Sequence, residues 1–222
     1  MATAAVIWDV DGTLVDTAEQ HFQAWQQIAN ELSYPFTRAD FVATFGMRNP
    51  EIIRQLFNPT ATDDECRAIG ERKENYYRQF IRTTGVKLLP GVARLLADAA
   101  MADWLQAVGS SAPLANLQLV LSITQTEKYF QAIVCGDDVR RGKPDPEVFL
   151  SAANKLGITP ERCLVIEDAV AGVQAAKTGK MKCIAVTLAG HHPADKLFSA
   201  GADLVVASLD QLRFEQIIQL LM

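Results

Sequence analysis

The chain has 222 residues, which is enough for one large domain or a domain with an inserted partner, but short for two complete α/β domains. Lysine and arginine number 21 and aspartate and glutamate 26, so the formal net charge at pH 7 is −5. This mild acidity argues against a nucleic-acid-binding protein and against a polybasic membrane-surface protein. Hydrophobic residues make up 49% of the chain and charged residues 21%, a globular rather than disordered composition.

The four cysteines lie far apart in the sequence and form no CxxC pair. This spacing disfavours a zinc ribbon or a disulfide scaffold, and we expect reduced and mostly buried thiols. The N-terminal segment has no basic region before its apolar run, and no stretch is apolar enough for a bilayer span. We therefore expect a cytoplasmic protein without a membrane partner. The cysteines are Cys66, Cys135, Cys163 and Cys183.

Six short apolar runs have the length and composition of strands buried on both faces. From residue 105 onward they alternate with helical patterns, which predicts an α/β fold with a doubly wound, Rossmann-like parallel sheet. The runs are Ala4–Trp8, Leu105–Val108, Ala132–Cys135, Cys163–Ile166, Cys183–Val186 and Leu204–Val206.

Two later helices carry start signals. Asp145 before Pro146 predicts an N-cap followed by proline at the first helical position, and Gly157 predicts the end of that helix. Asp168 is expected to cap a helix over residues 169–177.

Residues 16–87 interrupt this alternation and indicate consecutive helices without a convincing strand. The pattern of Ala18–Leu32 is helical, and Thr62-Asp63-Asp64-Glu65 has the form of a capping box that opens a long helix. We expect an α/β core formed by residues 1–15 and 88–222, with residues 16–87 inserted after the first strand as an all-helical cap.

Polar side chains follow four of the predicted strands. Because ligands of an open parallel sheet bind outside the carboxyl ends of its strands, we expect these side chains to meet at one edge. In chain order they are Asp9 and Asp11, Ser110 and Ser111, Lys143, and Glu167 with Asp168.

Up to four carboxylates would then gather near one lysine, Lys143. Like charges raise one another's pKa unless a cation compensates them. A hard divalent cation with oxygen ligands meets this need, and Mg²⁺ prefers one or two carboxylates together with waters and a phosphate. The Ser110 hydroxyl, glycine-flanked backbone amides and Lys143 offer donors that suit a phosphate dianion. Together these groups indicate phosphoryl transfer.

The same residues resemble the four motifs of the haloacid dehalogenase superfamily. Asp9-Val10-Asp11-Gly12-Thr13 after a hydrophobic strand is similar to the first motif. Val108-Gly109-Ser110, Gly142-Lys143-Pro144 and Ile166-Glu167-Asp168 are similar to the second, third and fourth, in the family's order. The predicted helical insert also falls where this family places a small helical cap. A single DxD pair is a weak signal, but four ordered motifs at strand ends are a specific one.

The resemblance implies a phosphatase that depends on Mg²⁺ and forms an aspartyl-phosphate. Asp9 would be the nucleophile, and Asp11 would protonate the leaving oxygen and then activate the acceptor. Mg²⁺ would bind the side chains of Asp9 and Asp168 and the backbone carbonyl of Asp11. Relatives that cleave carbon–halogen bonds lack the second aspartate, so Asp11 favours phosphate chemistry.

The remaining motif residues are implied to hold the transferred group. Ser110, Ser111 and Lys143 would bind the phosphoryl oxygens. Glu167 would contact neither the metal nor the phosphoryl group directly and would instead order Lys143 or a metal-bound water.

The segment Asp16–Trp25 closely resembles the first cap helix of β-phosphoglucomutases and related sugar-phosphate phosphatases. By this resemblance His21, Arg48 and Lys73 would face the active site, with His21 near the acid and Arg48 or Lys73 on a distal phosphate or hydroxyl. The sequence departs from this family at Lys180. Relatives tend to have glycine at this position, directly before methionine, and the lysine has no functional explanation.

Two features separate the phosphatases from the mutases. Thr13 is the phosphatase-like residue, and the segment Ser111–Asn116 lacks the polar Ser-Lys-Asn pattern of the mutases. We therefore expect a phosphatase that acts on small phosphorylated metabolites such as sugar phosphates. The alternative is a β-phosphoglucomutase that interconverts β-glucose 1-phosphate and glucose 6-phosphate. A phosphoacceptor signalling domain is disfavoured, since such domains are much shorter and have no helical insert. Nothing in the sequence demands more than a monomer.

Overall fold

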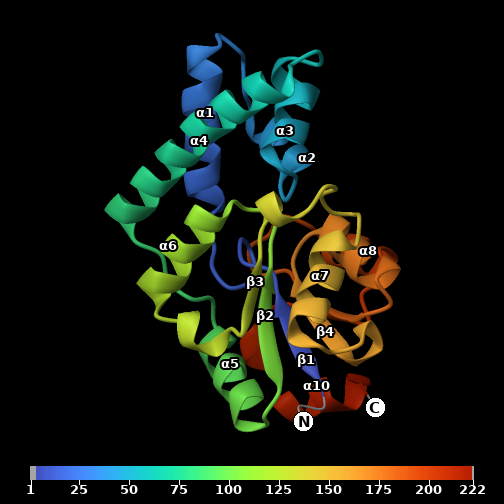
Figure 1. Ribbon diagram of the computed structural model, residues 1–222. Helices are drawn as coiled ribbons and strands as arrows, with labels where there is room; N and C mark the ends of the chain where they lie inside the picture. Colours follow the sequence, from blue (N-terminus) through green and yellow to red (C-terminus); the bar gives the residue numbers. More distant parts are fainter. Residues whose placement is uncertain (1–3, 222) are drawn as a thin grey trace.

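The predicted strands form one six-stranded parallel sheet in the computed structural model, which describes residues 4–221 (Figure 1). The strand order is β3-β2-β1-β4-β5-β6, and every neighbouring pair is parallel. This confirms the doubly wound α/β fold, with each predicted strand boundary within one residue of the observed one. The strands are β1 (Ala5–Trp8), β2 (Leu105–Gly109), β3 (Ala132–Val134), β4 (Cys163–Glu167), β5 (Lys182–Val186) and β6 (Leu204–Val206).

Helices cover both faces of the sheet, because successive strand residues point to opposite sides. Val6 and Trp8 of β1 pack into one apolar cluster, and Ala5 and Ile7 pack into another. The first cluster includes α5 (Val92–Met101), α6 (Leu114–Thr124) and α10 (Phe214–Leu221), and the second includes α7 (Glu147–Leu156), α8 (Val170–Thr178) and α9 (Ala194–Ser199). Short 3₁₀ turns are η2 (Glu127–Tyr129), η3 (Gly136–Asp138), η4 (Pro160–Arg162) and η5 (Leu209–Gln211). All four cysteines are free and buried, as expected.

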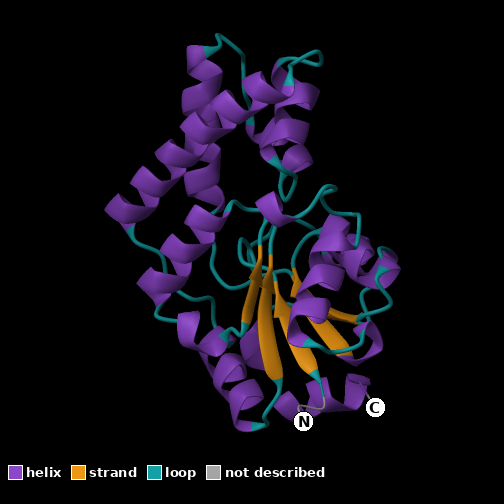
Figure 2. Cartoon of the chain, viewed as in Figure 1, coloured by secondary structure: helices purple, strands orange, loops and turns teal. Residues whose placement is uncertain are grey.

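The helices from Ala18 to Thr84, which follow β1 and precede α5, stand beyond the carboxyl ends of the strands (Figure 2). These helices have an apolar cluster of their own, which includes Phe22 and Trp25. The division of the chain at residues 16 and 87 into separate domains stays a prediction. The helices are α1 (Ala18–Glu31), α2 (Arg38–Thr44), α3 (Asn49–Ile52), the π-helix η1 (Ile53–Phe57) and α4 (Asp63–Thr84).

Helix starts follow the sequence signals in one of three cases. The Thr62 capping box is present, since its hydroxyl accepts the N–H of Glu65 and the Glu65 carboxylate accepts the N–H of Thr62. Asp145 is not an N-cap; α7 begins at Glu147, whose N–H donates to the Asp145 carboxylate. Asp168 does not cap α8 either; Ala169 stands at the N-cap position, and no side chain of the described residues accepts the first N–H groups of this helix.

Among residues 4–221, no helix combines the length and the apolar character that crossing a membrane requires.

Lys180 adopts a left-handed backbone conformation, with φ of 61°, and its side chain is exposed. This conformation costs an L-residue about 1–2 kcal/mol, whereas glycine adopts it freely. We expect Lys180→Gly to raise the free energy of unfolding by about 1 kcal/mol, measured by urea denaturation. The control Lys196→Gly, at an exposed position inside α9, should lower it by about 1 kcal/mol. Equal losses in both variants would contradict this explanation of Lys180.

Candidate active site

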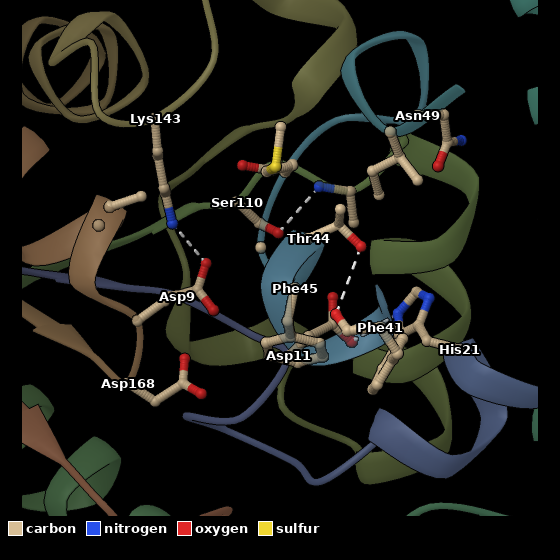
Figure 3. A pocket seen from close by; sticks show the side chains of 18 of the residues that line it. Asp9, Asp11, His21, Phe41, Thr44, Phe45, Asn49, Ser110, Lys143 and Asp168 are labelled. Carbon is tan, nitrogen blue, oxygen red and sulfur yellow. Dashed lines mark hydrogen bonds and ion pairs between the residues drawn. The ribbon is translucent and has the colours of Figure 1, made fainter. Parts of the chain in front are cut away.

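Four chain segments bring polar side chains to the carboxyl edge of the sheet (Figure 3). Asp9 directly follows β1, at the position between β1 and β4 where the strand order reverses. Its backbone N–H donates to the carbonyl of Ile166 at 3.0 Å, which ties the ends of these two strands together. A cavity of about 70 Å³ lies between this edge and the helical segment formed by α1 to α4. From the sheet edge it is lined by Asp9, Asp11, Ser110, Ser111, Lys143, Glu167 and Asp168.

Lys143 is the cation at the centre of this edge. Its Nζ donates to Asp9 Oδ1 at 2.6 Å and to Glu167 Oε1 at 2.8 Å, and its side chain is only 3% exposed. Burial alone would lower the pKa of Lys143, but the charges of Asp9 and Glu167 outweigh it and raise that pKa. Lys143 is therefore a fixed, charged donor with one hydrogen left for a ligand.

Glu167 holds the loop that follows β4. Its Oε2 accepts the backbone N–H groups of Asp168 at 2.6 Å and Ala169 at 2.5 Å, while Oε1 accepts Lys143. Gly172 packs so close to this carboxylate that a Cβ there would overlap it. The position thus requires glycine, and Glu167 fixes both Lys143 and the direction of Asp168.

Asp9 and Asp168 are buried carboxylates with too little positive charge around them. Burial raises the pKa of Asp9 from 3.8 to about 7, with Lys143 opposing the rise and Glu167 adding to it. Burial, followed by the charges of Glu167 and Asp9, raises the pKa of Asp168 well above its usual value. Asp168 Oδ2 is buried and has no hydrogen-bond partner. An unpaired buried carboxylate is costly, and a divalent cation would remove the cost.

The residues therefore fit Mg²⁺, with the side chains of Asp9 and Asp168 and the backbone carbonyl of Asp11 as candidate ligands. No three His, Cys, Asp or Glu side chains within residues 4–221 are grouped as a metal cluster. Two carboxylates with the other positions left to a carbonyl, water and phosphate match the ligand set that Mg²⁺ prefers.

The Asp11 carboxylate faces the helical segment. Its Oδ1 accepts the hydroxyl of Thr17 at 2.5 Å and that of Tyr77 at 3.4 Å, and His21 Nε2 lies 3.4 Å away. Burial tends to raise the pKa of Asp11, but His21 and the bond from Thr17 lower it to about 2. Asp11 is therefore ionised at neutral pH in this arrangement.

His21 is oriented from its other side by Lys73. Lys73 Nζ lies 2.8 Å from His21 Nδ1, and since an ammonium group can only donate, Nδ1 must be the acceptor. The opposite ring nitrogen, Nε2, is then directed at Asp11. His21 also stacks on Tyr77, with ring centroids 4.0 Å apart.

The sequence profile of the haloacid dehalogenase-like hydrolases matches residues 6–186. The chain belongs to this family. It is 35% identical over 217 residues to a β-phosphoglucomutase of Bacillus subtilis, covering 95% of this chain and 92% of that one. It is 29% identical over 206 residues to a phosphorylated carbohydrates phosphatase of Thermotoga maritima, covering 91% and 93%. The crystal structure of β-phosphoglucomutase from Clostridium difficile aligns with a TM-score of 0.88 and 28% identity, covering 100% of this chain and 97% of that one. This haloacid dehalogenase-like hydrolase is a phosphatase or a phosphomutase.

Arg48 is the predicted site residue that the structure does not bring to the cavity. Its guanidinium donates to Glu51 at 2.7 and 2.9 Å and to the carbonyls of Val139 at 3.3 Å and Arg140 at 3.2 Å. These partners turn Arg48 toward the loop after β3 and away from the cavity lining. His21 and Lys73 line the cavity and Arg48 does not, and contact of Arg48 with the substrate stays a prediction.

Glu74 and Asn49 also line the cavity and were not predicted from the sequence. Glu74 is buried in α4, where its carboxylate accepts Lys73 at 3.0 Å and Asn49 at 2.7 Å. The position of Glu74 in the helical pattern could have indicated its role, because Lys73 and Glu74 fall on the buried stripe of α4 between Gly70 and Tyr77. A charged pair on a buried helix face indicates a polar site rather than a solvated surface.

The raised pKa values of Asp9 and Asp168 predict how pH and Mg²⁺ act on stability. Without metal, the folded state holds these protons more tightly than the unfolded state. The resulting stabilisation is complete below about pH 4 and is lost as the pH rises through about 7. Because protons and metal compete for the same carboxylates, we expect Mg²⁺ to raise the melting temperature more at about pH 8 than at about pH 5.

Thermal unfolding with Mg²⁺ and with EDTA at both pH values measures this difference. The Asp168→Asn variant, which lacks one ligand carboxylate, should show a smaller effect of Mg²⁺. An equal effect at both pH values in the native chain would contradict the assignment.

Proposed function

We propose that this hydrolase is a Mg²⁺-dependent phosphatase of small phosphorylated metabolites, such as sugar phosphates, and that it works through an aspartyl-phosphate on Asp9. The observation that carries the proposal is the buried Asp9–Lys143–Glu167 ion network beside the unpaired Asp168 carboxylate. The relatives named above include a phosphatase of phosphorylated carbohydrates, which supports the substrate class.

Asp9 supplies the attacking oxygen. A carboxylate oxygen of Asp9 forms a bond to phosphorus while the bond from phosphorus to the leaving oxygen breaks. Lys143, with its remaining hydrogen, and the Ser110 hydroxyl hold the phosphoryl oxygens and balance the charge that develops on them. Mg²⁺, when bound by Asp9 and Asp168, supplies further positive charge to the same oxygens.

Asp11 carries the protons. In the first step it gives a proton to the departing alcohol oxygen, and in the second it takes one from the water that attacks the aspartyl-phosphate. The contacts with His21 and Thr17 favour the ionised carboxylate, the form that the second step requires. We therefore expect substrate binding to displace Asp11 from at least one of these partners before the first step.

We expect Asp9→Asn to lower kcat by at least about 10⁴-fold, because an amide cannot serve as the nucleophile. Phosphate release from sugar phosphates in the presence of Mg²⁺ measures the loss. Asp195→Asn, at an exposed position of α9, makes the same chemical change far from the site and should leave kcat unaltered. If a folded Asp9→Asn protein retained its activity, Asp9 would not be the nucleophile.

A phosphomutase is the second candidate, because a relative with 35% identity carries that name. The two reactions share the aspartyl-phosphate and differ in whether water or a second sugar phosphate attacks it. Incubation with β-glucose 1-phosphate and a trace of β-glucose 1,6-bisphosphate distinguishes them. We expect free phosphate to accumulate; glucose 6-phosphate formed without free phosphate would establish the mutase instead.

A further inference from the structure

The helical end of the cavity contains one lysine and one glutamate, and they neutralise each other. Lys73 Nζ lies 3.0 Å from Glu74 Oε1, and the two side chains are 3% and 6% exposed. Lys73 Nζ also lies within hydrogen-bond distance of His21 Nδ1, at 2.8 Å. A buried pair at this distance interacts strongly because little water screens it. The charge of Lys73 is therefore matched before any substrate enters.

Glu74 is held in place and kept ionised by further donors. Asn49 donates to Oε1 at 2.7 Å, and Asn116 at the start of α6 donates to Oε2 at 2.5 Å. Asn116 in turn accepts Arg78 Nη1 at 2.8 Å. Burial would raise the pKa of Glu74, but Lys73 and these hydrogen bonds lower it. The carboxylate of Glu74 is thus held in the position where it matches the charge of Lys73.

A second cation is not available to offset Glu74. Arg78 is directed to Asn116 and Asn75, and Arg48 to Glu51 and to two backbone carbonyls; neither guanidinium lines the cavity. The other lining side chains near Glu74 include Trp25, Met47 and Ile52, which carry no charge. Within the described residues, the helical end of the cavity offers no unmatched positive charge.

The sheet edge cannot take a second phosphate either. Asp9, Glu167 and Asp168 outnumber Lys143 there. The positive charge that Mg²⁺ would add at this edge is balanced by these carboxylates and by the phosphoryl group being transferred, so none remains for a second phosphate. Any other charged group on the substrate must lie toward the helical end, where Glu74 cancels the charge of Lys73 and leaves no net positive charge to pair with it. Burying a charged group without a partner is costly.

We propose that Glu74 is a specificity-determining residue that restricts this enzyme to phosphate monoesters whose remaining part is uncharged. The preferred substrates are small polyol or sugar monophosphates, and bisphosphates are rejected. This inference rests on the proposed phosphatase function.

The test compares sugars that differ by one phosphate: glucose 6-phosphate with glucose 1,6-bisphosphate, and fructose 1-phosphate with fructose 1,6-bisphosphate. Phosphate release gives kcat/KM for each, and p-nitrophenyl phosphate reports whether the chemistry itself operates. For the native enzyme we expect each monophosphate to be favoured by at least about tenfold over its bisphosphate.

The variant Glu74→Gln keeps the shape of the side chain and releases the charge of Lys73. We expect it to reduce the preference by about tenfold, through a lower KM for the bisphosphates rather than through kcat. General damage to the fold would instead lower kcat for both members of a pair. Glu31→Gln, which removes a partly exposed carboxylate paired with Arg72 outside the cavity, should leave the preference unchanged.

If the native enzyme hydrolyses p-nitrophenyl phosphate but has similar kcat/KM values for the monophosphate and the bisphosphate in both sugar pairs, the role of Glu74 is overturned. The phosphatase function is then unaffected. Failure to hydrolyse any of these esters in Mg²⁺ would overturn the phosphatase itself. The native ratios decide the matter even if Glu74→Gln does not fold.

Discussion

The structure depends on the burial of three carboxylates around a single ammonium group. Asp9 and Glu167 share Lys143, while Asp168 is buried beside them without a partner. In water these charges would be solvated separately; at the carboxyl edge of a doubly wound sheet they are held together, with an uncompensated negative charge. That imbalance raises the pKa of Asp9 and Asp168 and prepares the site for a divalent cation and, through it, for a phosphoryl group.

Close backbone approach makes this arrangement possible. A Cβ at Gly12 would overlap the Asp168 carboxylate, and one at Gly172 would overlap that of Glu167. Gly12 also has φ of 93°, a conformation in which a side chain would be strained. The two glycines let the loops after β1 and β4 pack against side chains of the site, so their role is spatial rather than chemical.

The helical segment between β1 and β2 supplies the environment of Asp11. Thr17, His21 and Tyr77 all contact its carboxylate, and Lys73 holds the ring of His21 from its other side. The protonation of Asp11 therefore depends on side chains of the helical segment, which also faces the cavity. A movement of α1 or α4 would alter the protonation of Asp11 and the shape of the cavity together.

The sequence predicted best where the physical cause is local or periodic. The strands follow from short apolar runs, and the Thr62 cap follows from partners within three residues. The convergence of Asp9, Ser110, Lys143 and Asp168 was predictable because parallel strands end at one edge.

Other features depend on partners distant in the chain. Arg48 is turned away by carbonyls about ninety residues further on, and Glu74 bonds to Asn116 in a helix of the other segment. Asp168 does not cap α8; its carboxylate lies at the cavity edge with Oδ2 unpaired. Such an orientation depends on the folded surroundings and is not encoded in any single motif.

A crystal structure with Mn²⁺ in place of Mg²⁺, located by its anomalous scattering, tests the central claim most directly. We expect one cation bonded to the carboxylates of Asp9 and Asp168 and to the carbonyl of Asp11, with Lys143 still bound to Glu167. A cation located elsewhere, or Asp9 and Asp168 sharing a proton with no metal between them at saturating Mn²⁺, would contradict it.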